Sequence, residues 1–208
     1  MSYNHIFMPE DHLDKLYNGK NPIVRYVFSK RLELISEILP EKPSLKILDA
    51  GCGEGHLIER LIKKLKQHSY TGVDITDIAL MKAKKRCPSA IIQKMDLYHL
   101  DFPDNSFDIV ICTEVLEHLS DYSTAIKELK RVLKHGGSLI ITFPNEKLWT
   151  LARILLLRRP IKVPDHINSF YPYQIISEVK LPLIQHYGWP FNLPFQMTLG
   201  YLLEFRKK

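Results

Sequence analysis

The sequence predicts an α/β fold built on a parallel sheet. Short apolar runs of strand length alternate with charged segments whose apolar residues recur every three or four positions, as in strands joined by helical crossovers. The first strand ends in a glycine cluster, at the edge where such sheets bind ligands. The chain has 208 residues, 45% of them hydrophobic and 25% charged, which is typical of one folded domain.

Four helical stretches are expected from periodicity and end signals. Residues 10–39 read as helical, with a break at Asn21-Pro22. The stretch 57–66 has apolar residues three and four positions apart, and 76–87 begins with Thr76 or Asp77 in a capping position and ends before a proline. Residues 120–134 form a capped amphipathic helix closed by Gly136 and Gly137.

The expected strands are apolar runs rich in β-branched residues. The run that includes Ile109–Cys112 does not alternate with polar residues, so its strand is expected to be buried on both faces. The strands in chain order are 45–51, 70–76, 90–96, 106–114, 138–144, 180–187 and 197–207.

Composition excludes several classes of protein. The first residues are acidic and proline-containing where a secretory signal needs an apolar run, and no stretch reaches the ~18 apolar residues of a spanning helix. A cytoplasmic location is therefore expected. Cys52, Cys87 and Cys112 are an odd number without a CxxC pair, so they are expected to be reduced, mostly buried thiols.

The net charge of +6 is concentrated at one end of the chain. Residues 1–146 hold 20 Lys and Arg against 20 Asp and Glu, whereas residues 147–208 hold 9 against 3. The second stretch has no Gly/Ser-rich linker before it, so it is interpreted as an elaboration of one domain.

The clearest chemical signal is the sequence from Asp49 to Gly55 at the end of the first strand. Its glycines permit a tight turn and leave no side chain between the backbone and a ligand. Asp74 ends the next strand, where an acid reaches ribose hydroxyls. His56 replaces the third glycine of the dinucleotide fingerprint, which disfavours NAD. A tight turn or a helix-terminal acid are the alternative readings.

These motifs resemble those of the class I S-adenosylmethionine-dependent methyltransferases, particularly the ubiquinone and menaquinone biosynthesis group. The matching stretches are ILDAGCGEG, VDI, MDLYHLDFPDNSFDIVICTEVLEHL and LKRVLKHGGSLIITFPN, in that order between about residues 45 and 146. The resemblance implies a Rossmann-like, mostly parallel sheet of seven strands with helices on both faces and a helical N-terminal cap. It divides the single domain into a cap (1–44), a cofactor-binding core (45–146), an acceptor-side insertion (147–170) and C-terminal strands (171–208).

The resemblance also assigns roles to cofactor-binding residues. Asp74 would hold the ribose hydroxyls of S-adenosylmethionine, and Asp96 with the Leu97 backbone would take the adenine edge; a strand-end turn is the alternative for Asp96. Thr113 and Glu114 would close the floor under the sulfonium. The methionine moiety would be lined by Asp49, Gly51, Gly53 and Gly55.

Two histidines, His118 and His166, are the available general bases, although a histidine bonded to a carbonyl or carboxylate is the competing interpretation. With Glu114 and Glu117 they could also bind a divalent ion. That set resembles the metal site of small-RNA 2′-O-methyltransferases and of some quinone-pathway O-methyltransferases. Acidic residues are also favoured at the start of a helix that binds no metal. We expect a structural role for these four residues and leave open whether they bind a metal ion.

Three functions remain compatible with the sequence. A methyltransferase for a small hydrophobic or amphipathic, lipid-like acceptor is preferred. The alternatives are a metal-assisted RNA 2′-O-methyltransferase and a binding protein without turnover. No separate RNA-binding module is visible, so a nucleic-acid partner is not expected. The segment 147–164 is basic and apolar and either gates the acceptor and touches a membrane surface or packs on the sheet or a second subunit. The acceptor atom and oligomeric state are left open.

Overall fold

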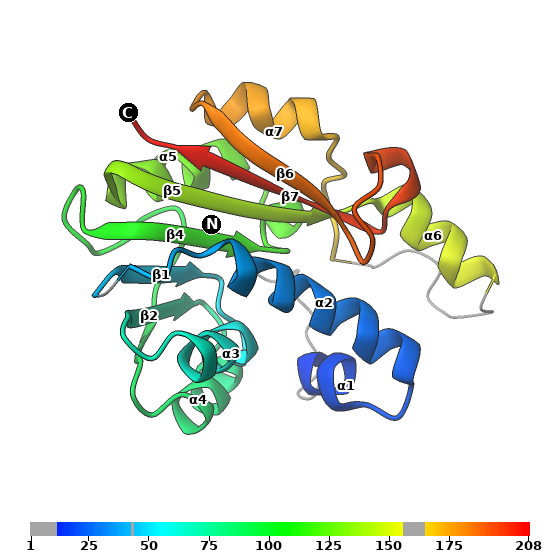
Figure 1. Cartoon of the computed structure of the whole chain (residues 1–208), viewed down its shortest axis with the longest axis horizontal. Coiled ribbons are helices and arrows are strands. Elements are labelled where there is room, and N and C mark those ends of the chain that lie inside the picture. Colours follow the sequence, from blue (N-terminus) through cyan, green and yellow to red (C-terminus); the bar gives the residue numbers. More distant parts are fainter. Residues whose placement is uncertain (1–11, 43, 156–164) are drawn as a thin grey trace.

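A seven-stranded sheet forms the centre of the molecule (Figure 1). The computed structural model describes residues 12–42, 44–155 and 165–208. Within them the strand order is β3-β2-β1-β4-β5-β7-β6. Neighbours from β3 to β5 are parallel, whereas β7 is antiparallel to both β5 and β6. The predicted mostly parallel α/β sheet is confirmed. The strands are β1 (Lys46–Ala50), β2 (Ser69–Asp74), β3 (Ile91–Lys94), β4 (Phe107–Thr113), β5 (Leu133–Pro144), β6 (Leu183–Trp189) and β7 (Gly200–Arg206).

Helices cover both faces of this sheet. α2, α3 and α4 supply apolar side chains to the core on one face, and α5 and α7 supply them to the core on the other (Figure 1). The helices are α1 (His12–Asn18), α2 (Pro22–Ile38), α3 (His56–Lys64), α4 (Asp77–Arg86), α5 (Tyr122–Val132), α6 (Glu146–Leu155) and α7 (Pro172–Val179), with short 3₁₀ turns η1 (Leu116–His118) and η2 (Phe195–Met197).

The central strands separate the two cores by simple alternation. Along β1, Ile47 belongs to the core under α2 and α3, and Leu48 belongs to the core under α5. β4 continues the same pattern, since its residues 109–112 are all buried. This explains why its sequence shows an unbroken apolar run rather than an alternating one.

The N-terminal helices are separated where the sequence predicts a break. The Asn21 side chain accepts hydrogen bonds from the backbone N–H groups of Ile23 and Val24, and Pro22 occupies the first position of α2. An N-cap of this kind begins a new helix rather than continuing α1. α1 and the neighbouring end of α2 lie beyond the sheet, near the ends of β1 and β4 (Figure 1).

Two elements differ from the sequence-based expectation. α5 ends at Val132, and Gly136 and Gly137 lie within β5 rather than closing the helix. The strand begins early because Leu133 pairs with Phe107 of β4. In addition, the stretch expected to hold only C-terminal strands begins with α7, which has proline at its start and a Gln174 side chain that accepts from the Tyr171 N–H.

α6 forms the described part of the predicted 147–164 segment. None of its residues is buried, and Leu151, Ile154 and Leu155 are exposed to solvent. The remaining residues of that segment, 156–164, lie outside the described residues. In the parts of the chain that are described, no helix combines the length and the apolar character needed to cross a bilayer.

Candidate active site

A cavity opens where β1 and β4 end, the point at which the strand order reverses direction. Crevices at this point are the usual ligand sites of open parallel sheets. The space between its walls amounts to about 910 Å³, counted with the part open to solvent. The predicted residues that line it are Asp49, Gly51, Gly53, Asp74, Leu97, Thr113, Glu114 and His118.

Three predicted site residues do not line this cavity. Gly55 faces α4 instead, where an added Cβ would lie 3.2 Å from both Ala83 and the Cys87 Sγ. Its positive φ of 81° and this close packing account for the glycine. Asp96 closes a turn by accepting from the Tyr98 N–H. His166 contacts His118, with the two ring centroids 4.7 Å apart, but is not among the residues that line the cavity.

The glycine loop is fixed to β2 by its backbone. The N–H groups of Gly51 and Cys52 both donate to the carbonyl oxygen of Val73, at 2.8 and 2.9 Å. An added Cβ would lie 2.3 Å from a methyl carbon of Val115 at Gly51, and 2.6 Å from the Leu13 Cδ1 at Gly53. A side chain is therefore excluded at both of these glycines, which line the cavity.

Asp49 is a buried carboxyl group without a direct neutralising partner. Its side chain is 2% exposed, and its Oδ1 has no hydrogen-bond partner among the described residues. Burial, and then repulsion from Asp74, raise its pKa to about 7, while Arg31 acts in the opposite direction. Arg31, which lines the same cavity, therefore offsets the negative charge of Asp49 only in part.

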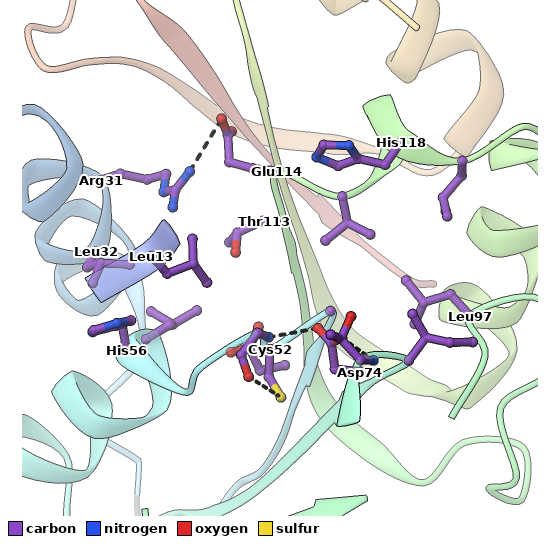
Figure 2. Close-up of a pocket in the computed structure, with 18 of the residues that line it drawn as sticks. Leu13, Arg31, Leu32, Cys52, His56, Asp74, Leu97, Thr113, Glu114 and His118 are labelled. Atoms are coloured by element: carbon purple, nitrogen blue, oxygen red, sulfur yellow. Dashed lines mark hydrogen bonds and ion pairs between the residues drawn. The ribbon is translucent and has the colours of Figure 1, made fainter. Parts of the chain in front are cut away.

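Asp74 holds the glycine loop and the start of α4 together. Its Oδ2 accepts from the Gly53 N–H and its Oδ1 accepts from the Thr76 N–H, both at 2.8 Å. Figure 2 shows this carboxylate facing the loop. Each carboxylate oxygen can accept two hydrogen bonds, so this group retains capacity for ligand hydroxyls.

An arginine from α2 crosses to the end of β4. Nη1 of Arg31 lies 3.3 Å from Oε2 of Glu114 (Figure 2), and its Nη2 donates to the Tyr17 hydroxyl oxygen at 2.6 Å. Glu114 also accepts from the Thr142 hydroxyl. Burial raises the pKa of Glu114, so the guanidinium beside it is needed to favour the charged form.

The side of the cavity opposite Leu97 and His118 is formed by Leu13, Arg31 and Leu32 of the N-terminal helices (Figure 2). α1 is attached there through Asp14, whose carboxylate forms an ion pair with Arg86 and lies close to His56. Asp14 Oδ1 lies 2.6 Å from the Arg86 Nη2 and 3.2 Å from the His56 Nε2. Burial, followed by repulsion from Arg86, lowers the pKa of His56 to about 4, so this histidine is neutral at pH 7.

Sequence reasoning missed the cap residues on the cavity wall. Tyr17 and Arg31 line it, but a periodicity analysis gives no reason to single them out. One signal was available for Arg31. It lies four residues from Val27 and from Ile35 on the buried side of α2, and a charged residue in an apolar stripe usually has a specific partner.

The described cavity fits S-adenosylmethionine better than a dinucleotide. Its wall places the carboxyl groups of Asp49 and Asp74 near the glycine loop, and an orphaned buried carboxyl oxygen favours a ligand that carries positive charge and hydrogen-bond donors. S-adenosylmethionine has a sulfonium, an ammonium group and a ribose diol. A pyrophosphate would instead meet two acidic side chains.

Comparison with known proteins agrees with this assignment. Residues 48–141 match the family described as "Methyltransferase domain". The chain is 30% identical over 59% of its length to a probable S-adenosylmethionine-dependent methyltransferase of Mycobacterium tuberculosis, and 34% identical over 57% to a demethylmenaquinone methyltransferase of Thermotoga maritima. The matched regions span 44% and 52% of those two relatives, so the chain covers about half of their length.

A solved structure shares the fold over nearly the whole chain. The TehB-like S-adenosylmethionine-dependent methyltransferase of Corynebacterium glutamicum superposes with a TM-score of 0.68, at 21% identity, over 95% of each chain. The strand order, the glycine loop and the family match point the same way. Residues 48–141 therefore match a methyltransferase domain, and the chain is similar in sequence and in fold to S-adenosylmethionine-dependent methyltransferases.

Proposed function

We propose that the chain is an S-adenosylmethionine-dependent methyltransferase that transfers a methyl group in line to a small hydrophobic or amphipathic acceptor. The observation that carries this proposal is the cavity at the ends of β1 and β4, where a glycine loop lies beside the carboxyl groups of Asp49 and Asp74. The family match of residues 48–141 supports the same activity.

In this proposal each wall of the cavity has a separate task. Asp74 accepts from the ribose hydroxyls, and Asp49 lies beside the positively charged methionine end. The Arg31–Glu114 pair fixes the floor next to Thr113. Bound S-adenosylmethionine supplies a methyl group that its sulfonium already activates. The chain therefore mainly has to orient two reactants and exclude water, and positioning alone contributes about 7 to 11 kcal/mol.

The helical cap provides the exclusion of water. Leu13 and Leu32 present apolar side chains to the cavity, and the Tyr17 ring lies 4.4 Å from the His56 ring, centroid to centroid. Of the two predicted bases, His118 lines the cavity and His166 does not. His118 is therefore the better candidate for contact with the acceptor.

A hydrophobic or lipid-like acceptor is supported by apolar surface near the cap. Exposed apolar side chains gather on α6, on the start of α2 and on the loop between β6 and β7; the last two surfaces meet where the rings of Tyr26 and Phe191 lie 6.3 Å apart. Large exposed apolar patches mark interaction sites. The Thermotoga maritima relative is named for demethylmenaquinone, which is compatible with such an acceptor.

Peripheral membrane contact is part of the proposal and is assigned to α6. Leu151, Ile154 and Leu155 are 48%, 49% and 73% exposed, so in the described chain they do not pack on the sheet. Trp149 of the same helix packs against Phe28 and Trp189 instead. Leu157, Arg158, Arg159 and Lys162 of the same predicted segment lie outside the described residues.

Calorimetry and isotope transfer test the activity. The chain is titrated with S-adenosylmethionine, its demethylated product and NADH, and then incubated with methyl-labelled cofactor and either a lipid extract or total RNA. Binding of the first two ligands, with label in the lipid extract, is expected. Label in RNA would show that the acceptor is RNA rather than a lipid-like molecule. Cofactor binding without methyl transfer would favour a binding protein. Binding of NADH alone would reject the proposal.

Co-sedimentation with anionic vesicles tests the membrane contact. The double variant Ile154→Asp/Leu155→Asp is expected to lose most binding because charged groups cannot enter the apolar interface. Met81→Asp is the matched control, since Met81 is 67% exposed but lies on α4. Equal sedimentation of wild type and the double variant would show that α6 does not bind a membrane surface.

A further inference from the structure

Arg31 is a buried cation on the wall of the cavity. It is 5% exposed and belongs to the buried side of α2, between Val27 and Ile35. Among the described residues that line the cavity, it is the one lysine or arginine. Its guanidinium carbon lies 5.7 Å from the ring centroids of both Phe28 and Trp189. These contacts hold the charge against apolar surface and away from water.

Two of the three guanidinium nitrogens of Arg31 have no hydrogen-bond partner. Within the described part of the chain, neither Nε nor Nη1 makes a hydrogen bond. The third nitrogen, Nη2, donates to the Tyr17 hydroxyl oxygen at 2.6 Å. A guanidinium carries five N–H donors, and buried donors without acceptors are costly. The cavity therefore presents a charged donor group that a ligand with a negative oxygen would complete.

Glu114 does not satisfy this group by itself. Its Oε2 lies 3.3 Å from Nη1, which is longer than the ~2.8 Å of a well-formed charge-assisted hydrogen bond. The same carboxylate also accepts from the Thr142 hydroxyl. Because Nε of Arg31 faces no acceptor among the described residues, it can donate to a ligand while Nη1 keeps its contact with Glu114.

Arg31 lies on the side of the cavity away from the predicted ribose site. Figure 2 shows Arg31, Glu114 and His118 above Thr113. Asp74 lies below Thr113, where it accepts from the glycine loop. In the proposed function Asp74 holds the ribose of the cofactor. Arg31 and His118 would then line the space that remains for the methyl acceptor.

The carboxylate of the cofactor has a different set of donors. α3 begins directly after the glycine loop, with Gly55 as its N-cap, and its first residues, His56 and Leu57, line the cavity. The first N–H groups of a helix have no partner within it and favour negative charge. The family match of residues 48–141 includes this helix start but not Arg31. Arg31 is therefore not needed to explain how the cofactor is held.

We propose that the methyl acceptor carries a carboxylate and that Arg31 binds it. This inference rests on the proposed function and narrows its hydrophobic or amphipathic acceptor to a lipophilic organic acid. Leu13 and Leu32 line the cavity together with Arg31, so they are placed to contact the apolar part of such a molecule. A guanidinium suits this task because its planar donors match a carboxylate better than an ammonium group does.

Binding of simple probes tests this assignment without methyl transfer. The full chain, saturated with the demethylated cofactor, is titrated by calorimetry with octanoate and with octanol, which share an apolar chain and differ in charge. Wild type should bind octanoate roughly 10-fold or more tightly than octanol, as expected for a hydrogen bond to a charged group. Binding of the demethylated cofactor in each variant shows that the variant is folded.

Two variants and one control assign the preference for the acid. Arg31→Lys keeps a cation beside Glu114 but loses the planar donors, so the preference should fall. Arg31→Met/Glu114→Gln removes both charges and should bind the two probes equally. Lys30→Met changes a neighbouring cation of α2 that is 35% exposed and does not line the cavity, and it should keep the preference of wild type.

A decarboxylated form of the demethylated cofactor identifies the source of the carboxylate. Its removal should weaken binding by the same factor in wild type and in the double variant. If the double variant shows no such loss, Arg31 binds the cofactor and the inference is wrong. It is also wrong if wild type does not prefer octanoate, or if the preference survives in the double variant. The proposed function fails on other results, namely no binding of the demethylated cofactor or no methyl transfer.

Discussion

The Arg31 Nη1 lies 3.3 Å from the Glu114 Oε2, which joins the helical cap to the end of a central strand. Arg31 is 5% exposed and Glu114 is 18% exposed. Glu114 has a positive φ of 54°, a conformation that costs energy for a residue with a side chain. The pair therefore fixes both the position of α2 and an unusual backbone turn beside the cavity.

Replacing the arginine alone should be more damaging than replacing both partners. Arg31→Met leaves the Glu114 carboxylate buried without its cation, and such changes cost about 3 to 5 kcal/mol of unfolding free energy. Arg31→Met/Glu114→Gln removes both charges and should be less destabilised than the single variant. Urea unfolding of Arg31→Met, Glu114→Gln and the double variant measures the coupling energy between the two side chains.

The exposed pair Lys30 and Glu33, also on α2, is the matched control. Their charged atoms lie 3.2 Å apart, similar to the Arg31–Glu114 pair, but both side chains are more than a third exposed, at 35% and 37%. Surface pairs contribute little. If Lys30→Met changed stability as much as Arg31→Met, burial would not be the reason for the effect.

Asp49 should make the ligand-free chain less stable at alkaline pH. Its folded pKa is raised from 3.8 to about 7, so its contribution is fully present below pH 4 and is lost as the pH rises through 7. Asp49→Asn cannot ionise and should exceed wild type in stability at pH 8 by a few kcal/mol, at about 1.4 kcal/mol per pKa unit. Urea midpoints at pH 5 and pH 8 measure the difference.

Asp49→Asn should also bind the positively charged S-adenosylmethionine more weakly than wild type does. Wild-type binding of S-adenosylmethionine is expected to strengthen between pH 6 and pH 8, with proton release that calorimetry detects in buffers of different ionisation enthalpy. Asp49→Asn should bind more weakly and release no such proton. Unchanged affinity together with unchanged stability would show that Asp49 is already neutralised in the free chain.

The sequence predicts the part of this site that depends on backbone form. Gly51 and Gly53 are needed because no side chain fits there, and Asp74 follows a strand of clear β pattern, so all three could be placed on one sheet edge from residue spacing. Gly55 belongs to the same motif but serves the packing of α4, because a glycine pattern does not tell ligand approach from helix approach.

The contacts between distant segments could not be predicted in this way. Arg31 and Glu114 are 83 positions apart in the numbering, and their pairing depends on how the cap folds over the sheet. Glu117, His118 and His166 were recognised as a possible set, but the sequence could not show that the Glu117 oxygens lack partners. α7 was missed because its eight residues are short for a helical period.

Asp74→Asn should weaken the binding of S-adenosylmethionine without unfolding the glycine loop. The amide retains one acceptor oxygen for a backbone N–H but loses the charge that strengthens bonds to the ribose hydroxyls. A hydrogen bond to a charged group contributes about 1.5 to 3 kcal/mol, or roughly 10- to 150-fold in affinity. Calorimetry with S-adenosylmethionine measures this, and Asp77→Asn at the start of α4 is the control. Equal loss in both variants would place the effect on the fold rather than on Asp74.

His56 should give the chain an acid-sensitive attachment of α1. Its folded pKa is lowered to about 4, so its stabilising contribution is present above pH 6.5 and is lost as the pH falls towards 4. The charged or titratable groups around it are Asp14 and Tyr17 of α1, Glu54, Glu59, Lys82 and Arg86.

His56→Gln should therefore remove the loss of stability between pH 6.5 and pH 4.5. Asp14 becomes protonated only below this range, because its pKa is lowered. α1 carries Leu13 and Tyr17 on the cavity wall, so hydrogen exchange in α1 should accelerate at pH 5 in wild type more than in the variant, after correction for the intrinsic rate. His135 is an exposed histidine near the start of β5, and His135→Gln should show the same loss of stability and the same exchange rates as wild type. If His56→Gln keeps the full acid sensitivity in both measurements, the attachment depends on the carboxylates and not on the buried imidazole.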